Sequence, residues 1–140
     1  MAGIGGRYDY SYQVNSVADA ANLITHLAQS GVNIDQLIIA GHGQPATQYL
    51  GRERISADVC PQDEEALQNI GAGMSPNGVV ELWGCNVANS SEPGSNSQRY
   101  LESIANAANR PVVAYTGRTW MIPVIWLPAN FGERIITMPK

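Results

Sequence analysis

The chain has 140 residues, of which 44% are hydrophobic and 14% are charged, and its formal net charge at pH 7 is -4. This length and composition predict a single globular domain over residues 1–140, with a core of its own, rather than a disordered chain. The negative charge and the scatter of the seven arginines, with Lys140 as the only lysine, argue against a general nucleic-acid binder.

We expect neither a membrane span nor a signal peptide. The apolar runs fall short of the about 18 residues of a spanning helix. The opening Met-Ala-Gly-Ile-Gly-Gly lacks the charged and apolar regions of a signal peptide, and residues 1–6 are expected to be flexible. The two cysteines are separated by twenty-four intervening residues and do not suggest a disulfide framework, which favours a reducing compartment.

The first regular pattern lies between residues 8 and 31. Alternation with polar residues predicts a half-buried strand that contains Tyr8, Tyr10, Tyr12 and Val14. Ser16, with Asp19 three positions later, has the spacing of a capping box at a helix start, and Gly31 is suited to the helix end. The apolar face of this helix consists of Val17, Ala20, Ala21, Ile24, Leu27 and Ala28.

The middle of the chain predicts a strand, a hairpin and a helix. The uniformly apolar run Leu37–Ala40 is typical of a central parallel strand that is covered on both faces. Residues 47–56 are expected to form a short hairpin that turns near Gly51. Pro61 begins a second helix, which ends near Gly73. Its inward side chains are Leu67, Ile70 and Met74.

The second half of the chain continues the alternation of strand and helix. Val79–Trp83 predicts a strand, and the polar stretch 89–94 predicts a loop. Ser95 with Gln98 offers a capping box for a third helix. The apolar face of that helix consists of Tyr100, Leu101, Ile104, Ala105 and Ala108.

The last part of the chain is richer in strand signals. Val112–Tyr115 predicts a strand, and the tail is more β-like than helical over residues 120–127 and 134–138. Strands that alternate with helices predict an α/β sandwich with a mainly parallel sheet. In such sheets the working site lies beyond the carboxyl ends of the strands.

Two of the predicted strands lead into glycine and then a single reactive side chain. Leu37-Ile38-Ile39-Ala40 is followed by Gly41-His42-Gly43, and Val79-Val80-Glu81-Leu82-Trp83 is followed by Gly84-Cys85-Asn86. Both motifs would stand at carboxyl ends of strands, so that an imidazole and a thiol lie side by side at one edge of the sheet. This is the minimum needed for a cysteine nucleophile activated by a neighbouring base.

Each motif also has a simpler interpretation. Glycine on both sides of His42 contributes no packing, which favours a close backbone approach or an unusual dihedral angle, and lets the Gly43 amide face a developing oxyanion. The alternative is an ordinary turn at a strand end. Cys85 would alternatively pack as a small buried hydrophobe. Its position after Gly84 and before a polar loop favours partial exposure instead, where a nearby imidazolium activates a thiol.

The other histidine and cysteine are expected to be structural. His26 falls off the apolar face of its helix and is predicted at the surface, and Cys60 precedes a helix as a packing or loop residue. A zinc site would need ligand pairs about two to four residues apart, which these four residues lack. The acidic run 63–65 suits the first turn of a helix. The sequence contains no phosphate-binding glycine loop, and we expect neither a metal nor a cofactor.

The two motifs, with the histidine first and the cysteine about forty residues later, resemble those of the caspase-like (clan CD) cysteine peptidases over roughly residues 36–117. The likeness is greatest to the autoprocessing cysteine protease domains of large bacterial toxins and related bacterial caspase-like domains. It implies a three-layer, caspase-hemoglobinase-like sandwich. It also implies cleavage of a protein substrate, or of the chain itself, in the cytoplasm or in a host or target cytosol.

The resemblance implies a role for each matching residue. His42 would be the general base and acid, Cys85 the nucleophile, and the backbone amides of Gly43 and Cys85 the oxyanion hole. The residues that would line the substrate site are Thr116, Arg118 and Trp120. Arg118 would select an acidic side chain or contact the substrate backbone, with Trp120 as an apolar wall; the alternative is a surface arginine after a turn.

The chain departs from the family pattern in three respects. It is shorter than the usual catalytic unit, it has one lysine where the toxin domains hold an inositol polyphosphate in a lysine-rich patch, and it offers no evident acidic partner for His42. Two other functions fit the same residues: a non-catalytic module that binds a peptide partner, and another thiol enzyme such as an acyltransferase or a deamidase. A homodimer through a sheet edge would suit a tail that contains Trp120, Ile122, Ile125 and Trp126.

Overall fold

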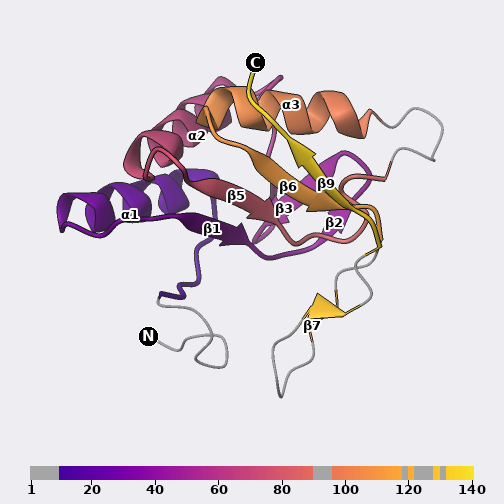
Figure 1. Ribbon diagram of the computed structural model, residues 1–140, viewed down its shortest axis with the longest axis horizontal. Helices are drawn as coiled ribbons and strands as arrows, with labels where there is room; N and C mark the ends of the chain where they lie inside the picture. The colour runs from indigo at the N-terminus through magenta and orange to yellow at the C-terminus, as the bar shows by residue number, and fades with distance from the viewer. Residues whose placement is uncertain (1–9, 90–95, 118–119, 122–127, 130–131) are drawn as a thin grey trace.

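The protein is a mixed α/β structure around a four-stranded sheet (Figure 1). The computed structural model describes residues 10–89, 96–117, 120–121, 128–129 and 132–140. The sheet has the strand order β1-β5-β6-β9. Its first three strands, β1 (Gln36–Ile39), β5 (Val79–Leu82) and β6 (Val112–Tyr115), are parallel, and β9 (Arg134–Thr137) is antiparallel to β6. The predicted α/β class with a mainly parallel sheet is therefore confirmed.

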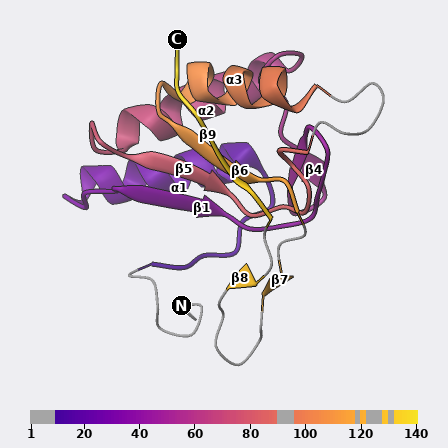
Figure 2. The same cartoon turned by 45° about the vertical axis from the view of Figure 1, so that its right-hand side comes forward.

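The three helices within the described residues form one layer on one face of this sheet (Figures 1 and 2). α1 (Val17–Gln29) packs against α2 (Pro61–Gly73), and α2 packs against α3 (Ser97–Ala108). The connections through α2 and α3 both lead to the next parallel strand in the same direction across the sheet, so that right-handed crossovers place both helices on the same face. The described residues thus form two layers, and the expected three-layer arrangement is not found among them.

The hydrophobic core lies between the helix layer and the sheet. Its fully buried members include Val80, Leu82 and Val112 from the sheet and Leu67, Ile70, Leu101 and Ile104 from the helices. Burial of each such side chain stabilises the fold by about 1.5–3 kcal/mol relative to exposure. The inward faces predicted for the second and third helices are confirmed by this core.

The helix starts follow the predicted signals, with one correction. The Ser16 hydroxyl accepts a hydrogen bond from the Asp19 N–H at 3.1 Å, so that Ser16 caps α1 as expected. α2 begins at Pro61. The cap of α3 is Asn96, whose side chain accepts from the backbone N–H of Arg99 at 3.2 Å, rather than Ser95, which lies outside the described residues.

Two strand predictions are wrong for the residues that the structure describes. Residues 10–14 form no strand. Their alternation places the rings of Tyr10 and Tyr12 on the same side, where they stack with centroids 6.5 Å apart, but neither is buried by a neighbouring strand. β1 is an edge strand of the four-stranded sheet and not a central one, and its burial rises from exposed Gln36 to buried Ile39. Tyr8 lies outside the described residues.

A second, small sheet follows β1 in the chain. It contains β2 (Gly43–Gln44), β3 (Thr47–Leu50) and β4 (Glu53–Arg54) in sequential antiparallel order. The hairpin predicted around Gly51 is confirmed as β3 and β4, with Gly51 at a φ of 64°. The sequence pattern did not predict β2, which is only two residues long.

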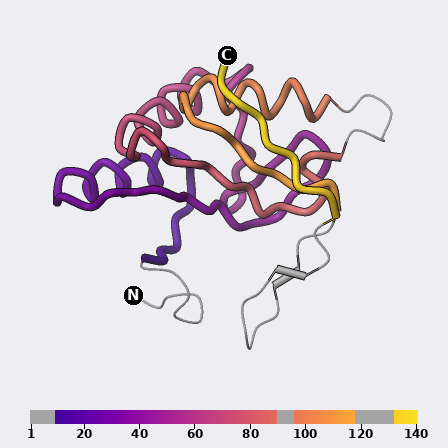
Figure 3. Tube along the Cα trace, viewed as in Figure 1, coloured from indigo at the N-terminus to yellow at the C-terminus, as the bar shows by residue number. Residues whose placement is uncertain are grey.

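The described part of the tail contains three short strands. β7 (Trp120–Met121) pairs with β8 (Pro128–Ala129), and β9 joins the main sheet, which confirms the β-like character predicted for residues 134–138. The C-terminus runs beside α3 (Figure 3), where the Lys140 N–H donates to Asn106 Oδ1 at 2.7 Å. None of the helices in the described ranges is long and apolar enough to cross a membrane.

Candidate functional site

The loops that follow β1 and β5 leave the sheet at the same end. The two strands are parallel neighbours, with Ile39 beside Leu82, and the Trp83 N–H donates to the Ile39 carbonyl oxygen at 2.8 Å. Residues 41–43 and 84–85 therefore both lie at the carboxyl ends of adjacent strands. This is the end of a parallel α/β sheet at which binding sites form.

The two loops meet backbone to backbone at a pair of glycines. A Cβ placed on Gly43 would lie 2.6 Å from the Gly84 Cα and 2.8 Å from the Cys85 nitrogen. A Cβ on Gly84 would lie 2.9 Å from the Gly43 Cα. Real side chains do not fit at such distances, so the contact requires glycine on both sides. The residues next in the chain, His42 and Cys85, are thereby brought to the same end of the sheet.

The strand β2 orients the histidine loop. The Tyr49 N–H donates to the His42 carbonyl oxygen at 2.9 Å, which makes Gly43 and Gln48 a non-hydrogen-bonded pair between β2 and β3. The N–H of Gly43 therefore points away from β3. A Cβ on Gly41 would lie 2.6 Å from the Tyr49 carbonyl oxygen, so the close backbone approach predicted for the glycines around His42 is confirmed. The His42 side chain is exposed.

Cys85 begins a tight turn that is anchored to β6. It is half-buried and forms no disulfide, in agreement with the partial exposure predicted for it. The next residue, Asn86, has a φ of 60° and donates its N–H to the Gly117 carbonyl oxygen at 2.8 Å. The Ala88 N–H donates to the Tyr115 carbonyl oxygen at 3.0 Å. These bonds fix the backbone path of the turn that carries the thiol.

A buried carboxylate lies in β5, four residues before the cysteine. Glu81 alternates with residues that face the helices, so its side chain is on the opposite face of the sheet, where it is only 7% exposed. It accepts hydrogen bonds from Gln36 Nε2 at 2.9 Å, from Trp83 Nε1 at 2.8 Å and from the Tyr115 hydroxyl. Burial and this carboxylate raise the pKa of Tyr115 to about 12. The network joins β1, β5 and β6 next to the turn.

Gln48 in β3 holds the cysteine loop through its side chain. It is fully buried, and its Oε1 accepts from the Gly84 N–H at 2.7 Å while its Nε2 donates to the Tyr49 carbonyl oxygen at 2.9 Å. Its backbone N–H donates to the hydroxyl of Tyr100, which in turn donates to the Ile55 carbonyl oxygen at 2.6 Å. Burial raises the pKa of Tyr100 well above its usual range.

The residues predicted to line the substrate site are only partly described. Thr116 follows β6, and its hydroxyl accepts from the Glu133 N–H at 2.8 Å while its own N–H donates to the Glu133 carbonyl oxygen at 3.0 Å. The next residue, Gly117, contacts the turn after Cys85 through the bond from Asn86. Trp120 lies in β7, but its side chain and all of Arg118 lie outside the described part of the chain.

The second histidine and the second cysteine lie in helices or at their ends. His26 is exposed in the last turn of α1, as predicted. Cys60 precedes α2, and its thiol donates to Gln62 Oε1 at 3.4 Å. Within the described ranges, no group of three or more His, Cys, Asp or Glu side chains is arranged to hold a metal ion.

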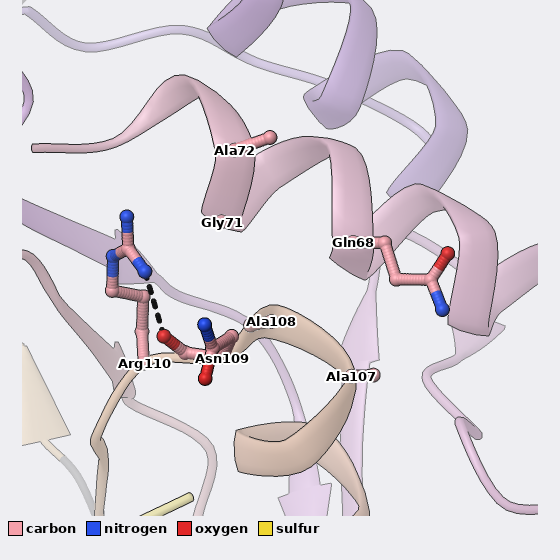
Figure 4. A pocket seen from close by; sticks show the side chains of 7 residues that line it. All are labelled: Gln68, Gly71, Ala72, Ala107, Ala108, Asn109 and Arg110. Atoms are coloured by element: carbon pink, nitrogen blue, oxygen red, sulfur yellow. Dashed lines mark hydrogen bonds between the residues drawn. The ribbon is translucent and has the colours of Figure 1, made fainter. Parts of the chain in front are cut away.

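A surface cavity of about 330 Å³ lies between α2 and α3 (Figure 4), and no residue of the two loops is among its described lining residues. Its lining residues are Gln68, Gly71, Ala72, Ala107, Ala108, Asn109 and Arg110. The Arg110 guanidinium donates to the carbonyl oxygens of Ser75 and Asn109. The lining residues that are described include no acid, histidine or cysteine, so the cavity brings together no groups for acid, base or nucleophilic chemistry.

The fold and the loops define an α/β protein in which a histidine loop and a cysteine loop adjoin at the carboxyl ends of neighbouring parallel strands. Residues 9–120 match DUF4347, a family described as a domain of unknown function. The chain therefore belongs to the DUF4347 family. No curated protein and no solved structure matches the chain.

Proposed function

We propose that the protein is a caspase-like cysteine peptidase that cleaves a protein substrate, or itself, with Cys85 as nucleophile and His42 as general base and acid. The observation that carries this proposal is the backbone contact of Gly43 with Gly84 and Cys85. It brings two motifs that are about forty residues apart in the sequence to one end of the sheet. A glycine pair with this steric requirement is poorly explained by two unrelated turns.

In the proposed reaction His42 takes the proton of the Cys85 thiol. The thiolate attacks the carbonyl carbon of the scissile peptide bond and forms a C–S bond, and His42 gives the proton to the amine as the C–N bond breaks. A water molecule then loses a proton to His42 and attacks the thioester carbon. The C–S bond breaks, and the proton returns to the sulfur as the acid product leaves.

The oxyanion of each tetrahedral intermediate would be bound by the backbone amides of Gly43 and Cys85. Two observations support this assignment. The N–H of Gly43 points away from β3 because of the strand register. The Cys85 nitrogen is one of the atoms nearest to the Cβ position of Gly43, at 2.8 Å. The two amides therefore belong to one compact stretch of backbone.

The substrate would bind along the segment that follows β6. Gly117 in that segment bonds to the turn after Cys85, which supports a substrate site next to the thiol. In this proposal Arg118 contacts an acidic side chain or the backbone of the substrate, and Trp120 forms an apolar wall. Thr116 would hold the segment in place, because its hydroxyl is engaged by Glu133.

The proposal includes a cytosolic site of action, in the source cell or in a target cell, because the thiol must stay reduced.

The proposal also includes a homodimer through the edge strand β9. Ile136 of β9 is 53% exposed, and the nearby Met138 is 60% exposed. An edge strand with exposed apolar side chains is a common place for two chains to pair.

The test compares alkylation of Cys85 by iodoacetamide between about pH 5 and 9 in the wild type, in His42→Ala and in His26→Ala. Cys60 in the same molecule is the internal reference, and peptide mass spectrometry reads both sites. We expect Cys85 to react at least about ten-fold faster than Cys60 at neutral pH, because a paired histidine activates a thiol. That excess should be lost in His42→Ala and kept in His26→Ala.

Equal rates at the two cysteines, unchanged in His42→Ala, would contradict the dyad and favour the non-catalytic peptide-binding module. The identity of the product separates the remaining thiol enzymes. A peptidase generates a new N-terminus in the protein that it acts on. An acyltransferase or a deamidase does not, although it uses the same thiol, imidazole and oxyanion hole.

A further inference from the structure

We propose that Gln48 is a positioning residue that sets the direction of the Cys85 amide; this inference rests on the proposed function. Gln48 is the cross-strand partner of Gly43 in the β2–β3 pair. Side chains of such a pair project from the same face of the ladder. The Gln48 side chain therefore lies on the face of the ladder toward which a Cβ on Gly43 would point. Gly84 occupies that position beside Gly43.

The orientation of the Gln48 amide is determined by both of its ends. Oε1 accepts from the Gly84 N–H at 2.7 Å, and Nε2 donates to the Tyr49 carbonyl oxygen at 2.9 Å. A flipped amide would set its NH₂ against the Gly84 N–H and its oxygen against a carbonyl, so only one orientation satisfies both partners. The side chain is fully buried, where an unpaired amide is costly.

The consequence for catalysis follows from the chain order. Gly84 and Asn86 stand on either side of Cys85, and both of their N–H groups are anchored, the first to Gln48 and the second to the Gly117 carbonyl oxygen. The Cys85 amide lies between these two fixed peptide units. Its N–H direction is therefore set by Gln48 on one side and by Gly117, in the segment that follows β6, on the other, which is the preorganisation that an oxyanion donor needs.

Gln48 is itself held from α3. The Tyr100 hydroxyl accepts from the Gln48 backbone N–H at 3.0 Å and donates to the Ile55 carbonyl oxygen. The hydroxyl thus joins β3 to the segment that follows β4. We infer that Tyr100 fixes the strand from which Gln48 reaches Gly84.

The experiment uses Gln48→Met, which keeps the length of the side chain and removes both hydrogen bonds of the amide. Gln68→Met, at an exposed glutamine of α2, is the matched chemical control, and Ile70→Val in the core controls for a loss of stability. Amide hydrogen exchange is measured at Gly84 and at Val80, whose N–H donates to the carbonyl oxygen of Pro111, the residue before β6. We expect exchange at Gly84 to rise at least about ten-fold in Gln48→Met, with Val80 nearly unchanged.

The second readout compares two reactions of Cys85 in each variant. Acylation by p-nitrophenyl acetate forms a C–S bond through an oxyanion and breaks the ester C–O bond, with p-nitrophenolate as leaving group. Alkylation by iodoacetamide displaces iodide and forms no oxyanion. We expect acylation to fall at least about ten-fold in Gln48→Met while alkylation stays within about two-fold, because only acylation uses the oxyanion donors.

Several outcomes would overturn the proposal. Acylation and alkylation that fall together in Gln48→Met would mean that the residue is only structural, and unchanged exchange at Gly84 would mean that it does not hold the loop. If Gln48→Met does not fold, Tyr100→Phe replaces it, with a smaller selective loss of acylation expected. If alkylation of Cys85 does not change in His42→Ala, the proposed function is contradicted, and the positioning role of Gln48 in catalysis is contradicted with it. Exchange at Gly84 tests the hydrogen bond from Gly84 to Gln48 independently of the proposed function.

Discussion

Gly43 and Gly84 are the residues on which the arrangement of the two loops depends. A methyl group on Gly43 would lie 2.6 Å from the Gly84 Cα, and because the obstacle is backbone, one loop must move away. We expect Gly43→Ala to lower the alkylation rate of Cys85 at least about ten-fold and to reduce the free energy of unfolding by about 1–3 kcal/mol. Cysteine alkylation and urea unfolding measure the two effects.

The control for that prediction is Gly31→Ala, in the turn after α1. Gly31 has a φ of 88° with no atom within 4 Å of the Cβ position, so alanine strains the backbone there without touching the site. It should lower stability by roughly 1 kcal/mol and leave the alkylation of Cys85 unchanged. Equal alkylation in Gly43→Ala and in the wild type would show that the glycine contact does not place the thiol.

Tyr115 gives the fold a dependence on alkaline pH. Its pKa is raised to about 12, first by burial and then by the Glu81 carboxylate. A tyrosine in the unfolded chain ionises near pH 10. Below that pH the hydroxyl contributes its full stabilisation, which is lost as pH rises toward 12, because the unfolded state loses the proton first. In urea unfolding, the stability difference between the wild type and Tyr115→Phe should be constant below pH 10 and shrink above it. A difference that grows above pH 10 would contradict the assignment.

Single residues of the site differ in how far the sequence predicts them. Gly41, His42 and Cys85 stand at strand ends beside glycine, and that local pattern is visible in the sequence. Gln48 could not be predicted, because a glutamine in a hairpin is expected to face water and only the tertiary contact with Gly84 buries it. Glu81 offered a signal, namely a charged residue within an otherwise apolar strand, which indicates a buried and fully bonded carboxylate.

At the scale of elements, the helices were predicted correctly because their signals are local in the sequence, whereas strands were predicted less well. The three helices follow from capping residues, from Pro61 and from apolar faces, all of which act within a few residues of the chain. Strands depend on partners that are distant in the sequence. The alternating tyrosines of residues 10–14 therefore form no strand, and the apolar run of β1 lies at a sheet edge.

The packing of α2 on α3 leads to a prediction at this scale. A Cβ on Gly71 would lie 1.7 Å from the Ala108 carbonyl oxygen, so that Gly71→Ala must separate the two helices. We expect a loss of about 1–3 kcal/mol in the free energy of unfolding. Gly73→Ala in the same helix should cost less, because its nearest atom is the side-chain Cγ2 of Ile24 at 2.8 Å, which is farther away than the backbone oxygen that faces Gly71. Urea denaturation of both variants tests this order, and a reversed order would contradict the helix contact.

The whole molecule places the proposed site at one end of a parallel sheet. α2 and α3, in right-handed crossovers, and α1, which packs beside α2, cover one face of the sheet. The loops after β1, β5 and β6 converge at the carboxyl ends of these strands. Alternation of strand and helix along the chain was sufficient to predict this class. The number of layers was not predictable, since it depends on the direction in which successive strands are added to the sheet.

The central claim is that His42 and Cys85 face one another across the glycine contact. The most direct measurement is cross-linking with 1,3-dibromoacetone, whose two carbon–bromine bonds are displaced in turn by a thiolate and by a neighbouring imidazole nitrogen. Mass spectrometry of the digested protein should show the peptides of Cys85 and His42 joined by a three-carbon bridge, in the wild type and in His26→Ala but not in His42→Ala. Modification of Cys85 without a bridge to His42 would contradict the claim.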